Sequence, residues 1–267
     1  MYIISSRAGF FDPDHLLQSG HLYGRVALAE GEVDRLGGFE QLDKVIANSR
    51  VLLLVHGYNN EHDEVLDAYQ TVEHHVANQL AGQYDHVLGY SWPGGDYRLE
   101  WFAAKSRANA VAARFRRLIV RIAHATASLD VMSHSLGARV VLKALRGVPG
   151  SGQPVRNYFC LAAAVDNESL EQDKEFAESI NHTKAMFVLH SNKDGVLTLA
   201  YRVAEFDRAL GLSGPEDKAF IENRTPNVFV VNCKNKVDRH GGYKHSVDVY
   251  SYMLQALGSG VPRFATL

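Results

Sequence analysis

Three residues far apart in the sequence carry the side chain types that activate a nucleophile: Ser135, Asp194 and His245. A serine hydroxyl is a weak nucleophile until a histidine removes its proton, and a carboxylate must orient that histidine. Each of the three follows an apolar run typical of a buried strand, and parallel strands bring such positions to one edge of a sheet. The pattern therefore predicts a catalytic triad for acyl transfer.

The sequence around Ser135 predicts the sharp turn that exposes a nucleophile. An apolar run ends in SHSLG, and a helix-forming segment, ARVVLKAL, follows at once. A turn of the G-x-S-x-G type holds the serine clear of the backbone above a helix N-terminus, and small residues are needed two positions to either side. Here these are Ser133 and Gly137, so a serine replaces the first glycine. We expect this replacement to tighten the turn slightly.

A second loop offers donors for the negative charge that develops on a substrate oxygen. The apolar run at residues 51–55 leads straight into HGYNN. The glycine lets the backbone approach a substrate, and N–H groups placed there and just after the nucleophile stabilise an oxyanion. We expect the donors to be the backbone N–H groups of Leu136 and of Tyr58 or its neighbour Asn59. For the His56 side chain we expect a structural role.

The acid and the base each have an alternative. Asp194 stands in NKDG after the run AMFVLHS, where an Asp-Gly turn or a helix start would also use an aspartate. Asp166, after LAAAV, is the alternative acid, because its loop also points to that edge of the sheet. The loop after the last predicted strand offers two histidines. We favour His245, which stands immediately before the final helix, and keep His240 as the alternative base.

Further residues near the predicted strand ends are candidates for a substrate pocket: His56, Asn59, Trp92 and His134. Tyr97 and Trp101 follow Trp92 in YSWPGGDYRLEW, and these rings would suit an acyl group, although core packing explains each of them equally well. The sequence contains no HExxH, CxxC or P-loop motif. We therefore expect no metal and no cofactor.

The pattern of apolar runs predicts the scaffold for these residues. Short aliphatic or β-branched runs alternate with helical patterns, which is typical of a mostly parallel sheet flanked by helices on both faces. Eight strands are predicted: YIISS, YGRVALA, RVLLLVHG, HVLGYSW, LDVMS, NYFCLAAAV, AMFVLHS and NVFVVNC. Helical patterns cover residues 62–81, 98–124, 137–146, 168–180, 195–210 and 246–257. In the second of these, the apolar face includes Phe102, Phe115 and Ile119.

Length and composition indicate an ordinary globular protein. The 267 residues are 46% hydrophobic and 22% charged, with a net charge of -2. This charge gives no bulk attraction to nucleic acid or to an anionic membrane surface. No run approaches the roughly 18 apolar residues of a spanning helix, and a secretory leader is not apparent, so we expect a cytoplasmic protein. We expect a single domain, 1–267, with a catalytic core at 51–257 and N-terminal strands or an extension within 1–50.

Five motifs in this order, VLLLVHGYNN, GYSWPGGD, VMSHSLGARVVLKAL, SNKDGVL and KHSVDVY, resemble those of an α/β-hydrolase family of bacterial proteins of unknown function. The similarity covers about residues 50–255. It implies an α/β-hydrolase fold with Ser135 as nucleophile, Asp194 as acid and His245 as base. The serine turn and the HG pair are typical of the superfamily, and the SWP segment indicates the family. The resemblance implies no particular substrate.

We therefore predict a serine hydrolase that cleaves a carboxylic ester or thioester through an acyl-enzyme on Ser135. The same triad would serve an amidase or a lactonase. The alternative is a non-catalytic binding module with this fold, which would be favoured if Ser135 and His245 lay too far apart for a proton relay or if residues 8–50 filled the pocket. The expected partner is a small-molecule acyl ester. Acyl chain length and oligomeric state depend on loops and surfaces that the sequence pattern leaves open.

Overall fold

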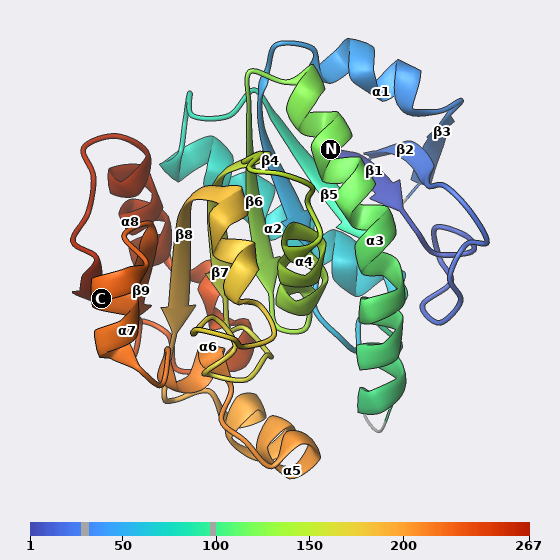
Figure 1. The fold of residues 1–267 in the computed structure, drawn as a ribbon. Helices are drawn as coiled ribbons and strands as arrows, with labels where there is room; N and C mark the ends of the chain where they lie inside the picture. The colour runs from blue at the N-terminus through green and yellow to red at the C-terminus, as the bar shows by residue number, and fades with distance from the viewer. Residues whose placement is uncertain (28–31, 97–99) are drawn as a thin grey trace.

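The computed structural model describes residues 1–27, 32–96 and 100–267, which build one mixed, mostly parallel sheet (Figure 1). The strand order is β10-β9-β8-β7-β6-β4-β5-β1-β2-β3. β2 pairs antiparallel with both β1 and β3, and the other neighbouring strands are parallel. The strands are β1 (Tyr2–Ser5), β2 (Leu22–Ala27), β3 (Glu32–Leu36), β4 (Arg50–Val55), β5 (His86–Ser91), β6 (Ser128–His134), β7 (Val155–Leu161), β8 (Thr183–His190), β9 (Val228–Asn232) and β10 (Phe264–Thr266).

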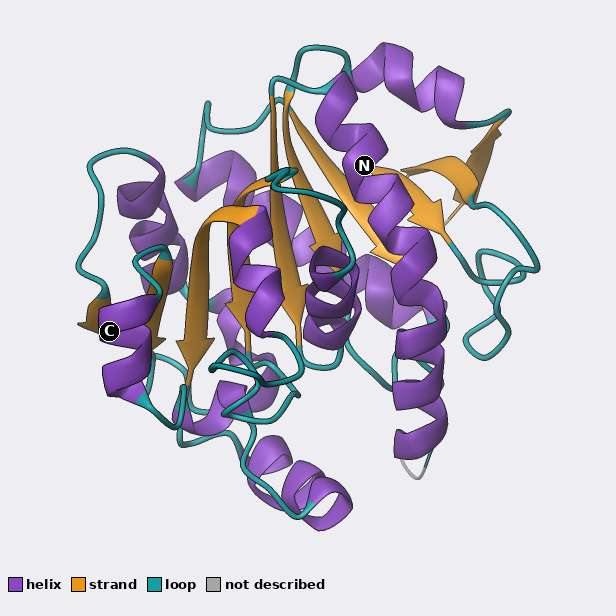
Figure 2. Ribbon diagram, in the orientation of Figure 1, coloured by secondary structure: helices purple, strands orange, loops and turns teal. Residues whose placement is uncertain are grey.

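Helices cover both faces of this sheet (Figure 2). They are α1 (Phe39–Ile46), α2 (His62–Gln79), α3 (Trp101–Ala125), α4 (Gly137–Arg146), α5 (Arg202–Glu205), α6 (Leu210–Ser213), α7 (Lys218–Arg224) and α8 (Val247–Leu257), with the 3-10 helices η1 (Ala177–His182) and η3 (His240–His245) and the π-helical turn η2 (Leu197–Tyr201). α4 packs between α3 and η1 on one face, and α2 packs against α8 on the other. Within the described residues, the helices lack the combined length and apolar character that a membrane crossing requires.

The central strands are apolar throughout because helices bury them from both sides. All five residues of β4 from Val51 to Val55 are at most 2% exposed. Across β7, β8 and β9, the rings of Phe159, Phe187 and Phe229 stack in register, with centroids 4.9 and 4.8 Å apart. This aromatic ladder fixes the alignment of three strands, so the loops that follow them leave the same edge of the sheet.

The predicted sheet is confirmed, and the structure adds β3 and β10 to the eight expected strands. Within the N-terminal region, the residues before α1 extend the sheet itself. β1 pairs with β5, and β2 and β3 continue the sheet at that edge. The predicted strand YGRVALA ends at residues 28 and 29, and the predicted helix 98–124 starts at residues 98 and 99. These four positions lie outside the described residues.

Three helix predictions need correction. Residues 168–176 form successive turns in place of a helix, and Asp173 has a left-handed φ of 62° that an α-helix does not accommodate. The pattern at 195–210 is divided into η2, α5 and α6, because Phe206 ends α5 with a φ of 57°. Phe102, expected in the core, is 67% exposed, since the first turn of α3 extends past the sheet.

Candidate active site

Ser135 sits at a sharp turn between β6 and α4, as the sequence predicts. Its φ is 55°, a conformation that non-glycine residues adopt only when the surroundings impose it. The segment after β7 does so. The Ser135 N–H donates to the Leu161 carbonyl at 3.0 Å, and the Ala164 N–H donates to the Ser135 carbonyl at 3.1 Å. The backbone of the candidate nucleophile is therefore held from both sides.

The two small residues around Ser135 have distinct reasons to be small. A β-carbon on Gly137 would collide with the backbone oxygens of Val55 and His56, so only glycine lets α4 begin this close to the end of β4. Ser133 is 1% exposed, and its Oγ lies 2.7 Å from the hydroxyl of Tyr158. The serine that replaces the usual glycine thus has a hydrogen-bond partner.

Asp194 and His240 form a hydrogen-bonded pair beside this turn. His240 Nδ1 lies 2.7 Å from Asp194 Oδ2, and Asp194 is only 1% exposed. The other carboxylate oxygen accepts the N–H of Leu197 at 3.0 Å, so the aspartate also begins the turn η2. Because Nδ1 of His240 is engaged by the carboxylate, Nε2 is the nitrogen that remains for a serine proton.

The structure pairs Asp194 with the alternative base, and His245 is not the histidine at this carboxylate. The loop after β9 enters η3 before α8 begins, and His245 is the exposed last residue of η3. Five residues along a 3-10 helix rotate a side chain by about one and two-thirds turns, which takes it away from the direction of His240. Partial burial, followed by the nearby charges of Lys244 and Arg239, lowers the pKa of His245, and Asp67 is the carboxylate that opposes this shift.

Asp166, the alternative acid, has a different role in the structure. Its Oδ1 accepts a hydrogen bond from the Tyr201 hydroxyl at 2.6 Å, and its backbone bridges to Ala209. Asp166 therefore anchors the segment that follows Asp194, through its contacts with Tyr201 and Ala209. The carboxylate beside a histidine of this site is that of Asp194.

A cavity of about 620 Å³ opens at the carboxyl ends of β4 and β6, and both Ser135 and His240 line it. Three predicted pocket residues, His56, Asn59 and His134, line it as well. Trp92 does not, because its ring is fully buried and stacks behind His56 at a centroid distance of 5.5 Å. Trp101 lines the cavity, and Tyr97 lies outside the described residues.

Several lining residues were not predicted from the sequence: Tyr69 and Val72 from α2, Leu197, Leu199 and Tyr201 from the segment after Asp194, and Lys244 from η3. The two α2 residues belong to an amphipathic helical pattern, which predicts that they pack in the core and does not distinguish core from cavity wall. The residues after Asp194 gave a usable signal, since a helical pattern directly follows the predicted acid. The sequence did not indicate which face of that pattern meets the cavity.

The HGYNN loop lies directly against the nucleophile. A β-carbon on Gly57 would come within 3.0 Å of Ser135 Cβ and 3.3 Å of the His134 carbonyl oxygen. The Asn60 N–H donates to the Gly95 carbonyl at 3.0 Å, which ties this loop to the SWPGG segment. The two motifs that follow neighbouring strands β4 and β5 therefore form one structure next to Ser135.

His56 orients the peptide group after Gly57. Its Nδ1 lies 2.8 Å from the Gly57 carbonyl, and its Nε2 accepts the Trp92 N–H at 3.1 Å. A carbonyl only accepts, so Nδ1 carries the proton and the ring is neutral. Burial, reinforced by the charge of Arg7, holds the pKa of His56 well below its usual value. Both ring nitrogens thus bind backbone groups, which is a structural use of the side chain.

His134 connects the serine turn to the loop of the candidate base. Its Nε2–H donates to the carbonyl of His240 at 2.8 Å, and the two rings lie 4.6 Å apart. Burial, followed by the neighbouring His240, lowers the pKa of His134 to about 3. His134 is therefore neutral over the working range of a serine hydrolase, and it fixes the distance between the residues on either side of the cavity.

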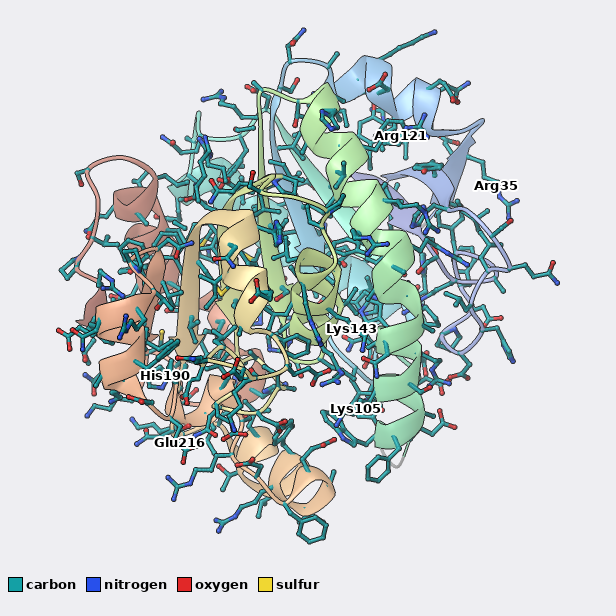
Figure 3. All side chains as sticks on the ribbon, in the orientation of Figure 1. Arg35, Lys105, Arg121, Lys143, His190 and Glu216 are labelled. Atoms are coloured by element: carbon teal, nitrogen blue, oxygen red, sulfur yellow. The ribbon has the colours of Figure 1, made fainter. Side chains whose placement is uncertain are left out.

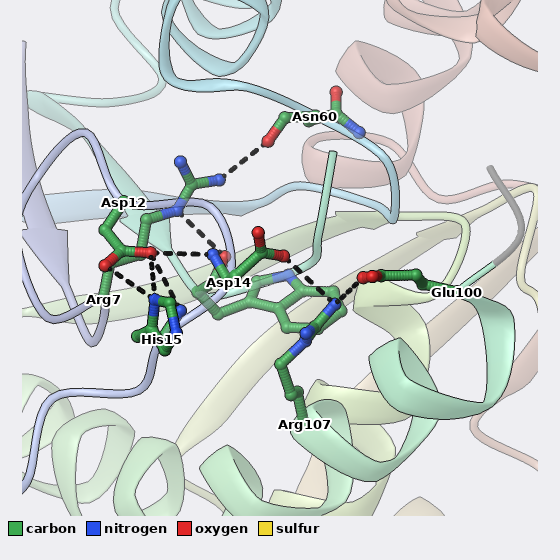
Figure 4. A network of polar contacts seen from close by, with 8 residues as sticks. Arg7, Asp12, Asp14, His15, Asn60, Glu100 and Arg107 are labelled. Atoms are coloured by element: carbon green, nitrogen blue, oxygen red, sulfur yellow. Dashed lines mark hydrogen bonds and ion pairs between the residues drawn. The ribbon is translucent and has the colours of Figure 1, made fainter. Parts of the chain in front are cut away.

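Arg7 supports the HGYNN loop from behind (Figure 4). The side chain is fully buried, its Nε donates to the Trp92 carbonyl at 3.1 Å, and its Nη2 donates to the Asn60 carbonyl at 2.9 Å. Burial lowers the pKa of Arg7 to about 10. The N-terminal residues therefore act as a clamp on the site, while the residues that line the cavity begin at Leu54.

A parallel sheet with a strained serine turn, an adjacent HG loop and a carboxylate-histidine pair at its carboxyl edge defines the α/β-hydrolase class. The family model described as "Alpha/beta hydrolase of unknown function (DUF900)" matches residues 39–248, and the chain belongs to this family. The resemblance inferred from the motifs is confirmed. Residues 1–38, including Arg7, lie outside the match. A search of curated proteins finds no match.

Three solved structures illustrate what the fold is similar to. The Pyrococcus furiosus esterase Pf2001 shares 13% identity over 79% of this chain and 80% of its own, with a TM-score of 0.46. A Pyrobaculum calidifontis esterase shares 12% over 80% and 77%, with a TM-score of 0.47. The phospholipase PlaB from Legionella pneumophila shares 16% over 58% and 42%, with a TM-score of 0.33. At these values the likenesses carry no argument about substrate.

Proposed function

We propose that the protein is a serine hydrolase that cleaves a carboxylic ester or thioester through an acyl-enzyme on Ser135, with His240 as base and Asp194 as the orienting acid. One observation carries this proposal. His240 is held at Nδ1 by the buried carboxylate of Asp194, and it lines the same cavity as Ser135. A serine at a strained turn and an oriented imidazole on one cavity are the parts that acyl transfer requires.

In the proposed reaction, Nε2 of His240 takes the proton from Ser135 Oγ as this oxygen attacks the substrate carbonyl. His240 then gives that proton to the departing alcohol or thiol. In the second half, His240 removes a proton from water, the resulting hydroxide attacks the acyl-enzyme, and the free acid leaves while Ser135 regains its proton. Asp194 keeps the imidazole in the required tautomer and stabilises its positive charge.

The proposed oxyanion donors are the N–H groups of Leu136 and Tyr58. Leu136 is the N-cap of α4, where N–H groups have no partner within the helix and the helix dipole favours negative charge. Tyr58 N–H belongs to the peptide whose carbonyl is Gly57 O, which His56 holds. In a planar trans peptide the N–H points opposite to that carbonyl. His56 therefore orients a donor, while both of its own ring nitrogens are engaged by backbone groups.

The cavity supports an acyl substrate of moderate size. Its volume lies within the range of small-molecule sites, and aliphatic and aromatic side chains make up much of the wall. An apolar wall suits an acyl chain, while the nearby backbone donors suit its carbonyl group.

The test is hydrolysis of p-nitrophenyl esters of increasing chain length by the intact protein and by three variants. Ser135→Ala and His240→Ala should reduce kcat to background, because each removes a reacting group. His245→Ala is the matched control, a histidine on the same 3-10 helix, and should retain kcat. Loss of activity in His245→Ala together with full activity in His240→Ala would refute the assignment of the base.

A further inference from the structure

The segment that follows Asp194, residues 196–206, has two faces of opposite character. One face is anchored to the protein through Leu197, Tyr201 and Glu205, which recur every four residues. Leu197 and Tyr201 are 2% and 3% exposed, the Tyr201 hydroxyl binds Asp166, and Glu205 accepts hydrogen bonds from Trp101 and Lys105. Thr198 adds a hydrogen bond from its hydroxyl to the Asp194 carbonyl at 2.7 Å, where the segment begins.

The opposite face is apolar and turned toward solvent. Val196, Leu199, Val203 and Phe206 recur at intervals of three and four residues, and they are 50%, 70%, 74% and 93% exposed. Exposed apolar residues scattered singly are ordinary, but a stripe with helical periodicity is not. We call these four residues the apolar stripe.

The apolar stripe is continuous with the mouth of the cavity. Val196 and Leu199 line the cavity as well as being exposed, and Val203 and Phe206 extend the same face outward. The first turn of α3 lies alongside, because Trp101 and Lys105 both bind Glu205 of α5; Figures 1 and 3 show α5 and this end of α3 projecting at the same side of the molecule. That turn adds Phe102, which is 67% exposed.

The charges beside the apolar stripe are mainly positive. Lys193, Arg202 and Arg208 are exposed, and none of them takes part in the ion pairs found among the described residues. Glu205 is neutralised by Lys105 at 2.5 Å. Asp207, directly after the segment, is an exposed carboxylate beside these cations. The whole chain has a net charge of -2, so the excess of positive charge is local to the surface beside the cavity.

We propose that the apolar stripe and its flanking cations dock on the surface of an anionic lipid aggregate, from which an ester passes its acyl chain between Val196 and Leu199 into the cavity. This inference rests on the proposed ester hydrolysis, since it names the physical state of the substrate. Apolar side chains enter the acyl boundary of a lipid surface, while adjacent Lys and Arg side chains attract anionic head groups.

A second copy of the chain fits this surface less well. The common twofold contact places a patch against itself, and it would bring Arg202 and Arg208 of one copy near those of the other. Like charges at close range oppose such a contact. An anionic lipid surface satisfies both the apolar stripe and the cations, which is why the proposal commits to it.

The test separates docking from hydrolysis. The intact protein is sedimented with vesicles of phosphatidylcholine alone and of phosphatidylcholine mixed with phosphatidylglycerol. The expected result is binding to the mixed vesicles, reduced at least about tenfold in V203S/F206S and about fivefold for each cation removed in R202Q and R208Q. The matched control L254S/F264S replaces two exposed apolar residues on other elements and should bind as the parent does.

Hydrolysis gives the second readout. With a short-chain ester below its solubility limit, V203S/F206S should keep the parental kcat/KM, whereas with a long-chain ester in anionic mixed vesicles its rate should fall in parallel with binding. Failure of the parent protein to bind the mixed vesicles would overturn the docking proposal, and so would a change of oligomeric state in V203S/F206S without any vesicle binding. Vesicle binding without cleavage of any ester would instead refute the proposed reaction and leave the docking surface supported.

Discussion

Replacement of Gly57 by alanine tests how closely the HGYNN loop must approach the nucleophile. The added β-carbon would lie 3.0 Å from Ser135 Cβ, 3.3 Å from the His134 carbonyl oxygen and 3.4 Å from His134 Nδ1. Ordinary contacts begin at 3.4 Å, so the loop must withdraw by about 0.4 Å. The movement carries the proposed donor, the Tyr58 N–H, away from the site of the oxyanion.

The size of the effect follows from that displacement. A misplacement of about 1 Å can cost about a hundredfold in rate, so a shift of about 0.4 Å should lower kcat about sixfold, with KM nearly unchanged because the donor acts mainly in the transition state. Strain from the extra methyl group should lower the free energy of unfolding by about 1–3 kcal/mol. Steady-state kinetics with a p-nitrophenyl ester and urea unfolding measure the two quantities.

A matched control exists on the same cavity. Gly241 also lines it, and a β-carbon there would have no atom within 4 Å. Gly241→Ala should therefore change kcat by less than about twofold. If Gly57→Ala retained the parental kcat, or if Gly241→Ala lost as much as Gly57→Ala, the proposed role of the HGYNN loop would be wrong.

Three further predictions concern the acid, the serine turn and pH. Asp194→Asn should lower kcat by about 10⁴, because an amide nitrogen in place of Oδ2 cannot accept a hydrogen bond from His240 Nδ1. The control Asp166→Asn should lose far less kcat. Comparable losses of kcat in the two variants would refute the choice of acid. Ser133→Gly removes the hydrogen-bond partner of the buried Tyr158 hydroxyl, so it should lower the free energy of unfolding by about 1–3 kcal/mol. Its kcat should stay within about twofold of the parental value. A large loss of kcat with an unchanged free energy of unfolding would contradict this prediction. Burial lowers the pKa of His134 to about 3 and that of His190 to about 4 in the folded protein. In the unfolded chain both histidines have a pKa of about 6.5, so below pH 6.5 the unfolded state binds more protons than the folded state. Stability should therefore be complete above pH 6.5 and fall as the pH is lowered toward 4, by up to about 1.4 kcal/mol per pH unit for each histidine, and urea midpoints that do not change over this range would refute it.

Much of the fold was predictable because buried parallel strands leave long apolar runs. The composition of VLLLV and VFVV indicates strands, and SHSLG followed by a helical pattern indicates the turn at Ser135. β10 was missed because its three residues carry little pattern, and β3 because its residues EVDRL are mostly polar. The turns at 168–176 were predicted as a helix because their charged and apolar residues follow a helical period.

The sequence indicated Ser135, Asp194 and two candidate histidines, but it did not indicate which histidine pairs with Asp194. Which histidine reaches Asp194 depends on where η3 begins and how it rotates its side chains, and a sequence period does not fix either. Trp92 looked like a pocket residue because it follows a strand at the catalytic edge, but stacking on His56 keeps it behind the wall. The role of Arg7 left no signal, since its two carbonyl partners lie 85 and 53 residues away.

The central claim is that the Ser135 hydroxyl is activated by the His240 and Asp194 pair within the folded protein. Its most direct measurement is labelling by a fluorophosphonate probe, with the modified residue located by peptide mass spectrometry. The account predicts stoichiometric labelling at Ser135 in the folded protein, none in Ser135→Ala or in the urea-unfolded chain, and strongly slowed labelling in His240→Ala but not in His245→Ala. Absence of labelling in the folded protein, or a label on any other residue, would contradict it.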